Sequence, residues 1–200
     1  MTNIVILICA YLIGSIPSGL WIGKAFFKTD IREHGSKNLG ATNSFRILGK
    51  KAGIVVTIID VLKGTAAVLL IHLPAFSDAT IHPLFLGLAA GIGHMYPIFA
   101  GFRGGKVVAT SAGILLGFEW PLFIVLFIVF FLALKLTKMV SLTSMISGVV
   151  AVIYGSVYWI VSGKFDLFIL TFLLCSFIIY RHRENIKRIK AGTEPKVKWI

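Results

Sequence analysis

Residues Val140–Val161, VSLTSMISGVVAVIYGSVYWIV, carry no charged side chain over their whole length. A helix that crosses the hydrocarbon core of a bilayer needs about 20 consecutive apolar residues, so this stretch has the length of one span. Similar runs occupy Ile4–Ile22, Ala52–Leu73 and Leu84–Phe102, and Phe165–Tyr180 is slightly shorter. We therefore predict an all-α, polytopic membrane protein.

The composition also favours a membrane protein over a soluble one. Of the 200 residues, 57% are hydrophobic and 14% are charged, whereas soluble domains carry about 25% charged residues. The net charge of +12 does not indicate a nucleic-acid partner, because the cations lie between apolar runs and form no separate basic domain. Cys9 and Cys175 lie inside hydrophobic runs, so we expect packing residues there and no disulfide.

The cations occupy alternate connectors. Of the 20 Lys and Arg residues, 18 fall in four groups, which lie at 24–51, 103–106, 135–138 and 181–200. The positive-inside rule makes these segments cytoplasmic. The N-terminus lacks the basic region of a signal peptide, so we expect it to be a retained first span that starts outside. The C-terminus is then cytoplasmic, and the number of crossings is odd.

Two short apolar runs, Val107–Phe118 and Pro121–Leu134, decide that number. If they form a tight hairpin that crosses the bilayer, the protein has seven transmembrane helices, some of them short. If the hairpin only dips into the membrane, five full spans remain. The charge pattern favours seven, in one membrane-embedded domain over residues 1–200.

Two basic segments have the composition of a phosphate site. His34–Asn43, HGSKNLGATN, is followed by Arg46, and Gly101–Lys106 reads GFRGGK directly before an apolar run. Glycines let backbone N–H groups approach an anion closely, and a helix N-terminus attracts negative charge. The spacing of a Walker A loop is absent. An ordinary basic membrane loop remains the simpler alternative.

Further polar residues follow the later spans. Ser141–Ser144 opens one apolar run, where its hydroxyls can also cap a helix. In Arg181–Arg188, His182 and Asn185 are three residues apart and share a helix face. An electrostatic tether to anionic lipids would explain the same cations.

Three ionisable residues lie inside predicted spans. Asp60 and Lys63 can pair on one helix face, and His94 precedes Pro97. Ionisable groups at such depth are functional candidates, but a buried structural pair explains Asp60 and Lys63 equally well.

The missing patterns restrict the chemistry. The sequence contains no His-x-x-x-x-Asp, no Gly-x-Ser-x-Gly and no zinc signature. The predicted cytoplasmic segments hold few carboxylates, so we expect no metal site and no cofactor.

Several stretches, taken together and in order, resemble the bacterial acyl-phosphate:glycerol-3-phosphate acyltransferases of the membrane-embedded type. They are Gly14–Gly19, Gly35–Asn43, Asp60–Gly64, Gly93–Lys106, Ser141–Ser144 and Arg181–Glu194. Lys37 stands where that family usually has glycine.

The resemblance implies transfer of a fatty acyl group from acyl phosphate to glycerol 3-phosphate, giving lysophosphatidate and phosphate, the first acylation of phospholipid biosynthesis. It further implies a multi-pass protein of the bacterial inner membrane with a cytoplasmic active site. Expected partners are these two substrates and membrane lipids, without coenzyme A, acyl carrier protein or nucleic acid, and the protein is expected to be a monomer.

On this basis we assign three sets of site residues. We expect Lys106, His182 and Asn185 to be catalytic. Glycerol 3-phosphate would bind at Ser36, Asn38, Arg46 and Ser144. Acyl phosphate would bind at Gly40, Thr42, Asn43, Gly104, Gly105 and Lys106. The hydroxyl proton passes to a substrate phosphate oxygen, or alternatively to His182 as general base.

Two other functions fit parts of the pattern. An anionic-solute transporter would use the polar residues inside the spans as a pathway, but no internal repeat is evident and the cations gather at one face. A transferase acting on a polyprenyl phosphate would need an acidic metal-binding cluster, which is missing.

Overall fold

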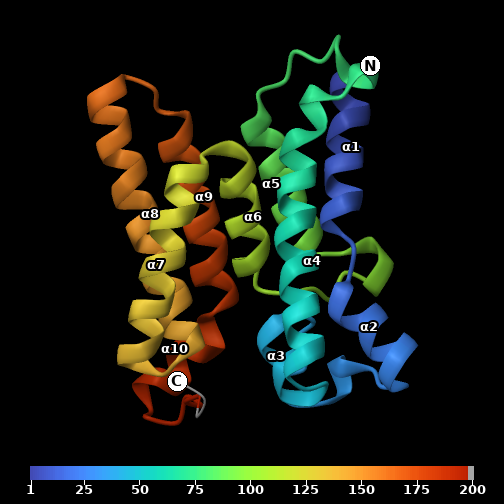
Figure 1. The fold of residues 1–200 in the computed structure, drawn as a ribbon, viewed down its shortest axis with the longest axis vertical. Helices are drawn as coiled ribbons and strands as arrows, with labels where there is room; N and C mark the ends of the chain where they lie inside the picture. The colour runs from blue at the N-terminus through green and yellow to red at the C-terminus, as the bar shows by residue number, and fades with distance from the viewer. Residues whose placement is uncertain (198–200) are drawn as a thin grey trace. The chain divides into compact units, whose positions relative to one another are not determined.

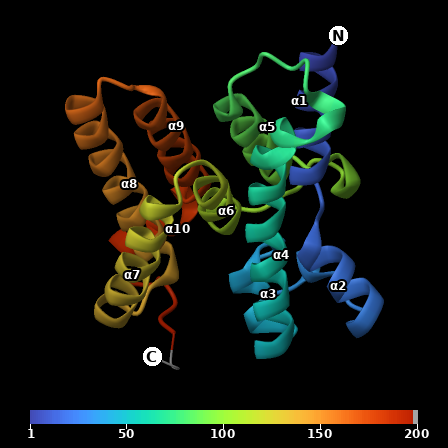
Figure 2. The same cartoon turned by 45° about the horizontal axis from the view of Figure 1, so that its top comes forward.

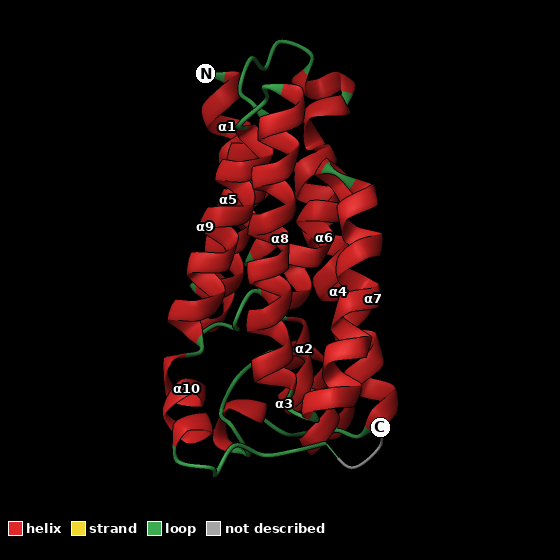
Figure 3. Cartoon of the chain, turned by 90° about the vertical axis from the view of Figure 1, so that its left-hand side faces the viewer, coloured by secondary structure: helices red, strands yellow, loops and turns green. Residues whose placement is uncertain are grey.

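In a bilayer the backbone must satisfy its own hydrogen bonds, which favours helices. In the computed structural model, which describes residues 1–197, every regular element is a helix (Figure 3). The predicted all-α class is therefore confirmed for this part of the chain. Lys198, one of the counted tail cations, lies outside the described residues. The chain divides into two compact units, the first ending at Phe118 and the second beginning at Glu119.

The first unit consists of α-helices joined by short connectors and single 3-10 turns (Figure 1). Its α-helices are α1 (Thr2–Gly14), α2 (Ser18–Phe27), α3 (Ala41–Ile47), α4 (Lys50–Leu69), α5 (Pro83–Met95) and α6 (Val108–Phe118). Its 3-10 turns are η1 (Ile31–Glu33), η2 (Leu70–His72), η3 (Pro74–Phe76) and η4 (Ile98–Ala100). Helix α4 packs against α1, α5 and α6 and is the centre of this unit (Figure 2).

The first apolar run does not form one straight helix. Helix α1 ends at Gly14, α2 begins at Ser18, and their axes differ by 44°. Pro17 lies in the break, where its ring cannot donate a backbone hydrogen bond to the preceding turn. The run Ile4–Ile22, predicted as a span, is therefore bent between Gly14 and Ser18, and its crossing as one span stays a prediction.

Small residues let the helices of the first unit approach closely. A Cβ atom on Gly113 of α6 would collide with the carbonyl oxygen of Val61 in α4, and one on Gly64 would collide with the carbonyl oxygen of Thr110. A Cβ atom on Gly14 of α1 would likewise collide with Ala90 of α5. Such contacts are typical of helices packed within a membrane, where van der Waals contact replaces the hydrophobic effect.

The second unit contains the remaining helices, which are α7 (Trp120–Thr137), α8 (Val140–Ser162), α9 (Asp166–Arg181) and α10 (Arg183–Lys190). Helix α8 packs against both α7 and α9. After α9 the chain turns at His182, and α10 lies beyond the end of α9 (Figure 3). Cys175 of α9 is buried against Gly148 of α8 as a free thiol, in keeping with the predicted packing role.

The surface of the long helices is apolar. On α7, for example, Phe127 and Leu132 are more than half exposed, and Leu136 is 84% exposed. Soluble monomers avoid apolar patches of such extent, whereas helices that face lipid require them. The structure and the sequence therefore agree on a membrane protein.

Four of the described helices are long and apolar enough to cross a membrane, and a fifth is added if α1 and α2 form one bent span. Helix α7 has 18 residues, so Pro121–Leu134, predicted as an arm too short to cross comfortably, is part of a helix of spanning length. Helix α6, with 11 residues, remains short. Helix length and composition thus support four or five crossings. The seven crossings stay a prediction.

Candidate active site

The loop before α3 is shaped by Asn43. This side chain is 1% exposed; its Oδ1 accepts a hydrogen bond from the Ser36 backbone N–H at 3.0 Å, and its Nδ2 donates to the carbonyl oxygens of Ile31 at 2.9 Å and His34 at 3.2 Å. Each amide atom is thus engaged within the loop. Asn43, predicted as an acyl-phosphate residue, is therefore placed to hold the loop in shape.

Two residues in this loop have left-handed backbone conformation, namely Gly35 (φ +59°) and Lys37 (φ +58°). Glycine takes this conformation freely, whereas a side chain makes it costly. The structure thus gives a physical reason for a glycine at the position of Lys37.

Four predicted substrate residues lie in the loop or in the first turns of α3. Ser36, Thr42 and Arg46 are exposed, and Asn38 is half-buried. The Asn38 Oδ1 atom accepts a hydrogen bond from the Gly40 backbone N–H at 2.9 Å. Ser36 and Asn38 are therefore presented on a loop whose backbone is fixed from beneath, and Thr42 and Arg46 are presented on α3 directly after it.

Arg32 ties this loop to the segment before α6. Its guanidinium binds Asp30, with Nη2 2.6 Å from Oδ2, and its Nη1 donates to the Ala100 carbonyl oxygen at 3.1 Å. The hydrogen bonds from Arg32 hold the pKa of Asp30 well below its usual range. Asp30 is therefore ionised at neutral pH, and the two basic segments of the first unit are linked through η1 and η4.

The second basic segment rests on His94. Gly105 donates its N–H to the His94 carbonyl oxygen at 3.0 Å, and a Cβ atom on Gly104 or Gly105 would collide with His94. Lys106 is half-buried, and Val107 has φ +61° before α6 begins at Val108. A β-branched residue in this region is a backbone outlier, and such strain gathers at functional sites. The sequence predicts a helix directly after Lys106, and α6 begins two residues after it, at Val108.

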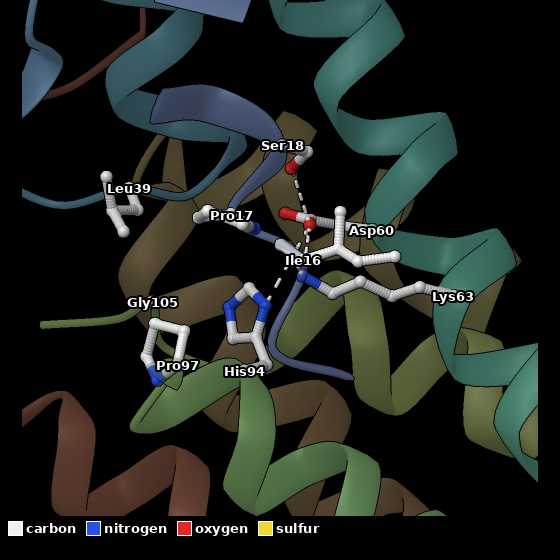
Figure 4. Close-up of a pocket in the computed structure, with 9 residues that line it drawn as sticks. All are labelled: Ile16, Pro17, Ser18, Leu39, Asp60, Lys63, His94, Pro97 and Gly105. Atoms are coloured by element: carbon white, nitrogen blue, oxygen red, sulfur yellow. Dashed lines mark hydrogen bonds and ion pairs between the residues drawn. The ribbon is translucent and has the colours of Figure 1, made fainter. Parts of the chain in front are cut away.

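A buried polar cluster lies beneath both segments (Figure 4). The Lys63 ammonium is 2.7 Å from Asp60 Oδ1 and donates to the Ile16 carbonyl oxygen at 2.8 Å. The Ser18 hydroxyl donates to the same carboxylate oxygen at 2.7 Å, and His94 Nδ1 lies 3.8 Å from it. The pocket lined by these residues also touches Leu39 of the first loop and Gly105 of the second.

In the second unit, Glu194 accepts hydrogen bonds from three side chains. Its carboxylate accepts hydrogen bonds from Ser141 Oγ at 2.5 Å, Asn185 Nδ2 at 2.6 Å and Arg188 Nε at 2.8 Å. The side chain is 6% exposed. Burial alone would raise the pKa of Glu194, but these three hydrogen bonds outweigh it and lower the pKa below its usual value. Asn185, a predicted catalytic residue, is therefore oriented by a carboxylate.

His182 is held between α9 and α10. It is 3% exposed, and its Nδ1 lies 2.8 Å from the Ile178 carbonyl oxygen. Because a carbonyl oxygen can only accept, Nδ1 carries the hydrogen, and Nε2 is an acceptor in the neutral ring. Ser144, predicted to assist glycerol 3-phosphate binding, is also buried in this unit, and its hydroxyl donates to the Val140 carbonyl oxygen at 2.8 Å.

Comparisons with known proteins identify the family. The family described as Glycerol-3-phosphate acyltransferase matches residues 4–192. The chain belongs to the glycerol-3-phosphate acyltransferase family. A Bacillus subtilis glycerol-3-phosphate acyltransferase is 56% identical over 98% of this chain and 97% of its own length. A glycerol-3-phosphate acyltransferase from Listeria monocytogenes is 53% identical over 99% of this chain and 98% of its own length.

Two solved structures have the same fold. Both are crystal structures of PlsY, described as an integral membrane glycerol 3-phosphate acyltransferase, and both are 35% identical to this chain and cover 98% of it. The glycerol 3-phosphate form has a TM-score of 0.88, and the match covers 96% of its length. The lysophosphatidic acid form has a TM-score of 0.85, and the match covers 95% of its length. The predicted family, acyltransferase activity and integral membrane location are confirmed, and the membership favours an enzyme over a transporter.

Two parts of this acyltransferase were not predicted as site residues. Glu194 was missed because nothing in the local sequence shows that it meets Ser141 and Asn185. Asp60 and Lys63 were predicted as a possible pair, which is confirmed at 2.7 Å. Their contact with Ser18 and their closeness to His94 depend on tertiary packing. Within residues 1–197, no group of three His, Cys, Asp or Glu side chains is placed to hold a metal ion.

Proposed function

We propose that residues 1–200 form a single membrane-embedded enzyme that transfers a fatty acyl group from acyl phosphate to glycerol 3-phosphate. The observation that carries the proposal is the pocket in the first unit, where Leu39 of one glycine-containing basic loop and Gly105 of the other lie over the same buried cluster. Both substrates bring a phosphate, and two basic loops that carry cations and polar side chains suit two phosphates.

Residue roles follow from the types of donor. Ser36, Asn38 and Arg46, with help from Ser144, bind glycerol 3-phosphate. The acyl phosphate is held by Lys106 and by the two segments that contain Gly40, Thr42, Asn43, Gly104 and Gly105. Lys106, His182 and Asn185 stabilise the charge that develops on the carbonyl oxygen and on the departing phosphate.

In the reaction, the hydroxyl oxygen of glycerol 3-phosphate attacks the acyl carbonyl carbon. The bond between that carbon and the phosphate oxygen then breaks, which releases inorganic phosphate and lysophosphatidate. The hydroxyl proton passes to a phosphate oxygen of the substrate. Nε2 of His182, an acceptor in the neutral ring, orients the hydroxyl without keeping its proton.

Topology and location form part of the same proposal. Both basic loops face the cytoplasm, as does the segment from Arg181 onward, in a seven-span monomer of the bacterial inner membrane. The charge distribution supports this orientation, since 18 of the 20 Lys and Arg residues fall in the segments placed inside.

The decisive experiment is a turnover assay of the purified protein with glycerol 3-phosphate and either palmitoyl phosphate or palmitoyl-coenzyme A. Formation of lysophosphatidate from the phosphate donor alone is the expected result. Turnover with the thioester alone would overturn the assignment of the acyl donor.

Lys106→Ala tests the position of the site in the same assay. Loss of a charge-stabilising donor lowers kcat by on the order of 10²-fold, and we expect at least that loss. Lys190→Ala is the matched control, because Lys190 is an exposed lysine at the end of α10 and should keep parental turnover. A Lys106→Ala protein with parental turnover would remove Lys106 from the site.

A further inference from the structure

One buried carboxylate connects four segments of the first unit. Asp60 lies in α4 and is 2% exposed. It accepts a hydrogen bond from Ser18 at the start of α2 and forms an ion pair with Lys63, whose ammonium also holds the carbonyl oxygen of Ile16. It further faces the His94 ring at 3.8 Å (Figure 4).

On one side, this cluster reaches the loop that carries Ser36 and Asn38. Gly19, adjacent to Ser18, packs so closely against the carbonyl oxygen of Leu39 that a Cβ atom there would collide with it. The same Cβ atom would lie 3.0 Å from the Ser44 hydroxyl in α3. The position of Ser18 therefore fixes the position of the loop.

On the other side, the cluster reaches Lys106 through His94. The carbonyl oxygen of His94 accepts from the Gly105 N–H at 3.0 Å, and the ring leaves no room for a Cβ atom on Gly105. A shift of His94 therefore shifts the segment Gly104–Lys106.

A buried ion pair is a weak source of stability, because removing two charges from water costs about as much as their attraction returns. Its better-supported use is to select one arrangement of the surrounding chain. The arrangement selected here is that of the two basic loops relative to each other.

We propose that Asp60 is a positioning residue, which holds the Ser36–Asn43 loop and the Gly104–Lys106 segment at the separation that catalysis needs. The role of these two segments as substrate-binding loops rests on the proposed function. Since each loop keeps its own donors when Asp60 is changed, substrate affinity should persist while the reacting atoms are misplaced. A displacement of about 1 Å lowers turnover by on the order of 10²-fold.

The test compares Ser18→Ala with Ser15→Ala. Both serines are buried at the same helix break, and both substitutions remove one hydroxyl oxygen. The Ser15 hydroxyl has no hydrogen-bond partner within the described residues, whereas the Ser18 hydroxyl donates to Asp60. We expect Ser18→Ala to lower kcat about tenfold with both KM values within about twofold of the parent, and Ser15→Ala to keep parental kcat. Asp60→Asn should lower kcat by on the order of 10²-fold.

Calorimetric titration with glycerol 3-phosphate counts the binding-competent molecules in each preparation, so kcat is expressed per competent molecule. The proposal is overturned if Ser18→Ala and Ser15→Ala have equal kcat, or if the loss in Ser18→Ala disappears after this correction. The Ser18→Ala comparison decides the question even if Asp60→Asn does not fold. Failure of the proposed function has a different signature: the parent then makes no lysophosphatidate from palmitoyl phosphate, or Lys106→Ala keeps parental turnover.

Discussion

At the scale of single residues, Lys37 adds a positive charge to its loop but has an unfavourable backbone conformation. Its φ of +58° lies in the left-handed region, which costs a residue with a Cβ atom about 1–2 kcal/mol. Glycine avoids that cost but loses more entropy on folding. We therefore expect Lys37→Gly to raise the free energy of unfolding by roughly 0.5–1 kcal/mol, measured as thermal unfolding in detergent.

Lys50→Gly is the control for that substitution. Lys50 is an exposed lysine that begins α4 and has no positive φ, so glycine there should lower stability. If both variants lose stability, the left-handed conformation of Lys37 carries no cost.

Replacement of His182 tests which group takes the hydroxyl proton of glycerol 3-phosphate. We expect His182→Gln to lower kcat without changing the shape of the pH–rate profile, because the substrate phosphate takes the proton. The measurement is kcat between pH 5.5 and about 9, where a general base would appear as an acidic limb. Disappearance of such a limb in the variant would instead assign the proton to Nε2 of His182.

Residue types were predictable from the sequence, but their partners were not. Glycines beside hydroxyls and cations identified the two loops of the first unit, since these features are local. The pairing of Asp60 with Lys63 was predictable because three residues apart is a helix contact. The bonds of Asp60 to Ser18 and of Glu194 to Ser141 join residues 42 and 53 positions apart, and no local pattern reveals such contacts.

At the scale of elements, the segment after α10 holds two helices together. Glu194 bonds Ser141 of α8 and both Asn185 and Arg188 of α10, and the Val197 N–H donates to the Lys138 carbonyl oxygen at 2.8 Å. Because folding lowers the pKa of Glu194, its ionised form stabilises the folded state above the unfolded pKa. That contribution is lost as pH falls through the folded value.

Glu194→Gln removes this contribution at neutral pH. We expect the variant to unfold at a lower temperature than the parent at pH 7, since it loses a charged acceptor of three hydrogen bonds. The difference should shrink as the pH falls from the ordinary glutamate value of about 4.3 through the lower folded pKa, where the folded parent carboxylate becomes protonated. Glu184→Gln, an exposed carboxylate on α10, is the control and should show no such pH dependence. A constant Glu194→Gln difference across this range would contradict the linkage.

Element boundaries show where hydropathy succeeds and where it fails. The run Val140–Val161 became α8 (Val140–Ser162) almost residue for residue, because no proline or glycine pair interrupts it. The run Ile4–Ile22 split because Pro17 and the contact of Gly19 with Leu39 end α1 and redirect the chain. Hydropathy reports burial in lipid, and it is insensitive to a bend that tertiary contacts impose.

At the scale of the whole molecule, the number of crossings depends on the connector between α6 and α7. Only Glu119 separates the end of α6 from the start of α7. Helix α6 has 11 residues, which span about 16.5 Å at 1.5 Å per residue. The hydrocarbon core is about 30 Å thick, so α6 crosses only with help from the extended chain before it or from a locally thinner bilayer. The charge pattern nevertheless requires Trp120 to lie outside in a seven-span protein.

Cysteine accessibility decides between seven spans and five. In a background with Cys9→Ala and Cys175→Ala, we expect a membrane-impermeant maleimide to label Trp120→Cys and Ser77→Cys in intact cells. Glu33→Cys should react only after the membrane is permeabilised. All three positions are exposed on the protein, so protection does not reflect burial among the protein's own side chains. If Trp120→Cys is protected in intact cells while Ser77→Cys reacts, the hairpin dips into the membrane without crossing it. The cations before and after the hairpin then lie on the same side of the membrane because the hairpin returns to the side from which it entered.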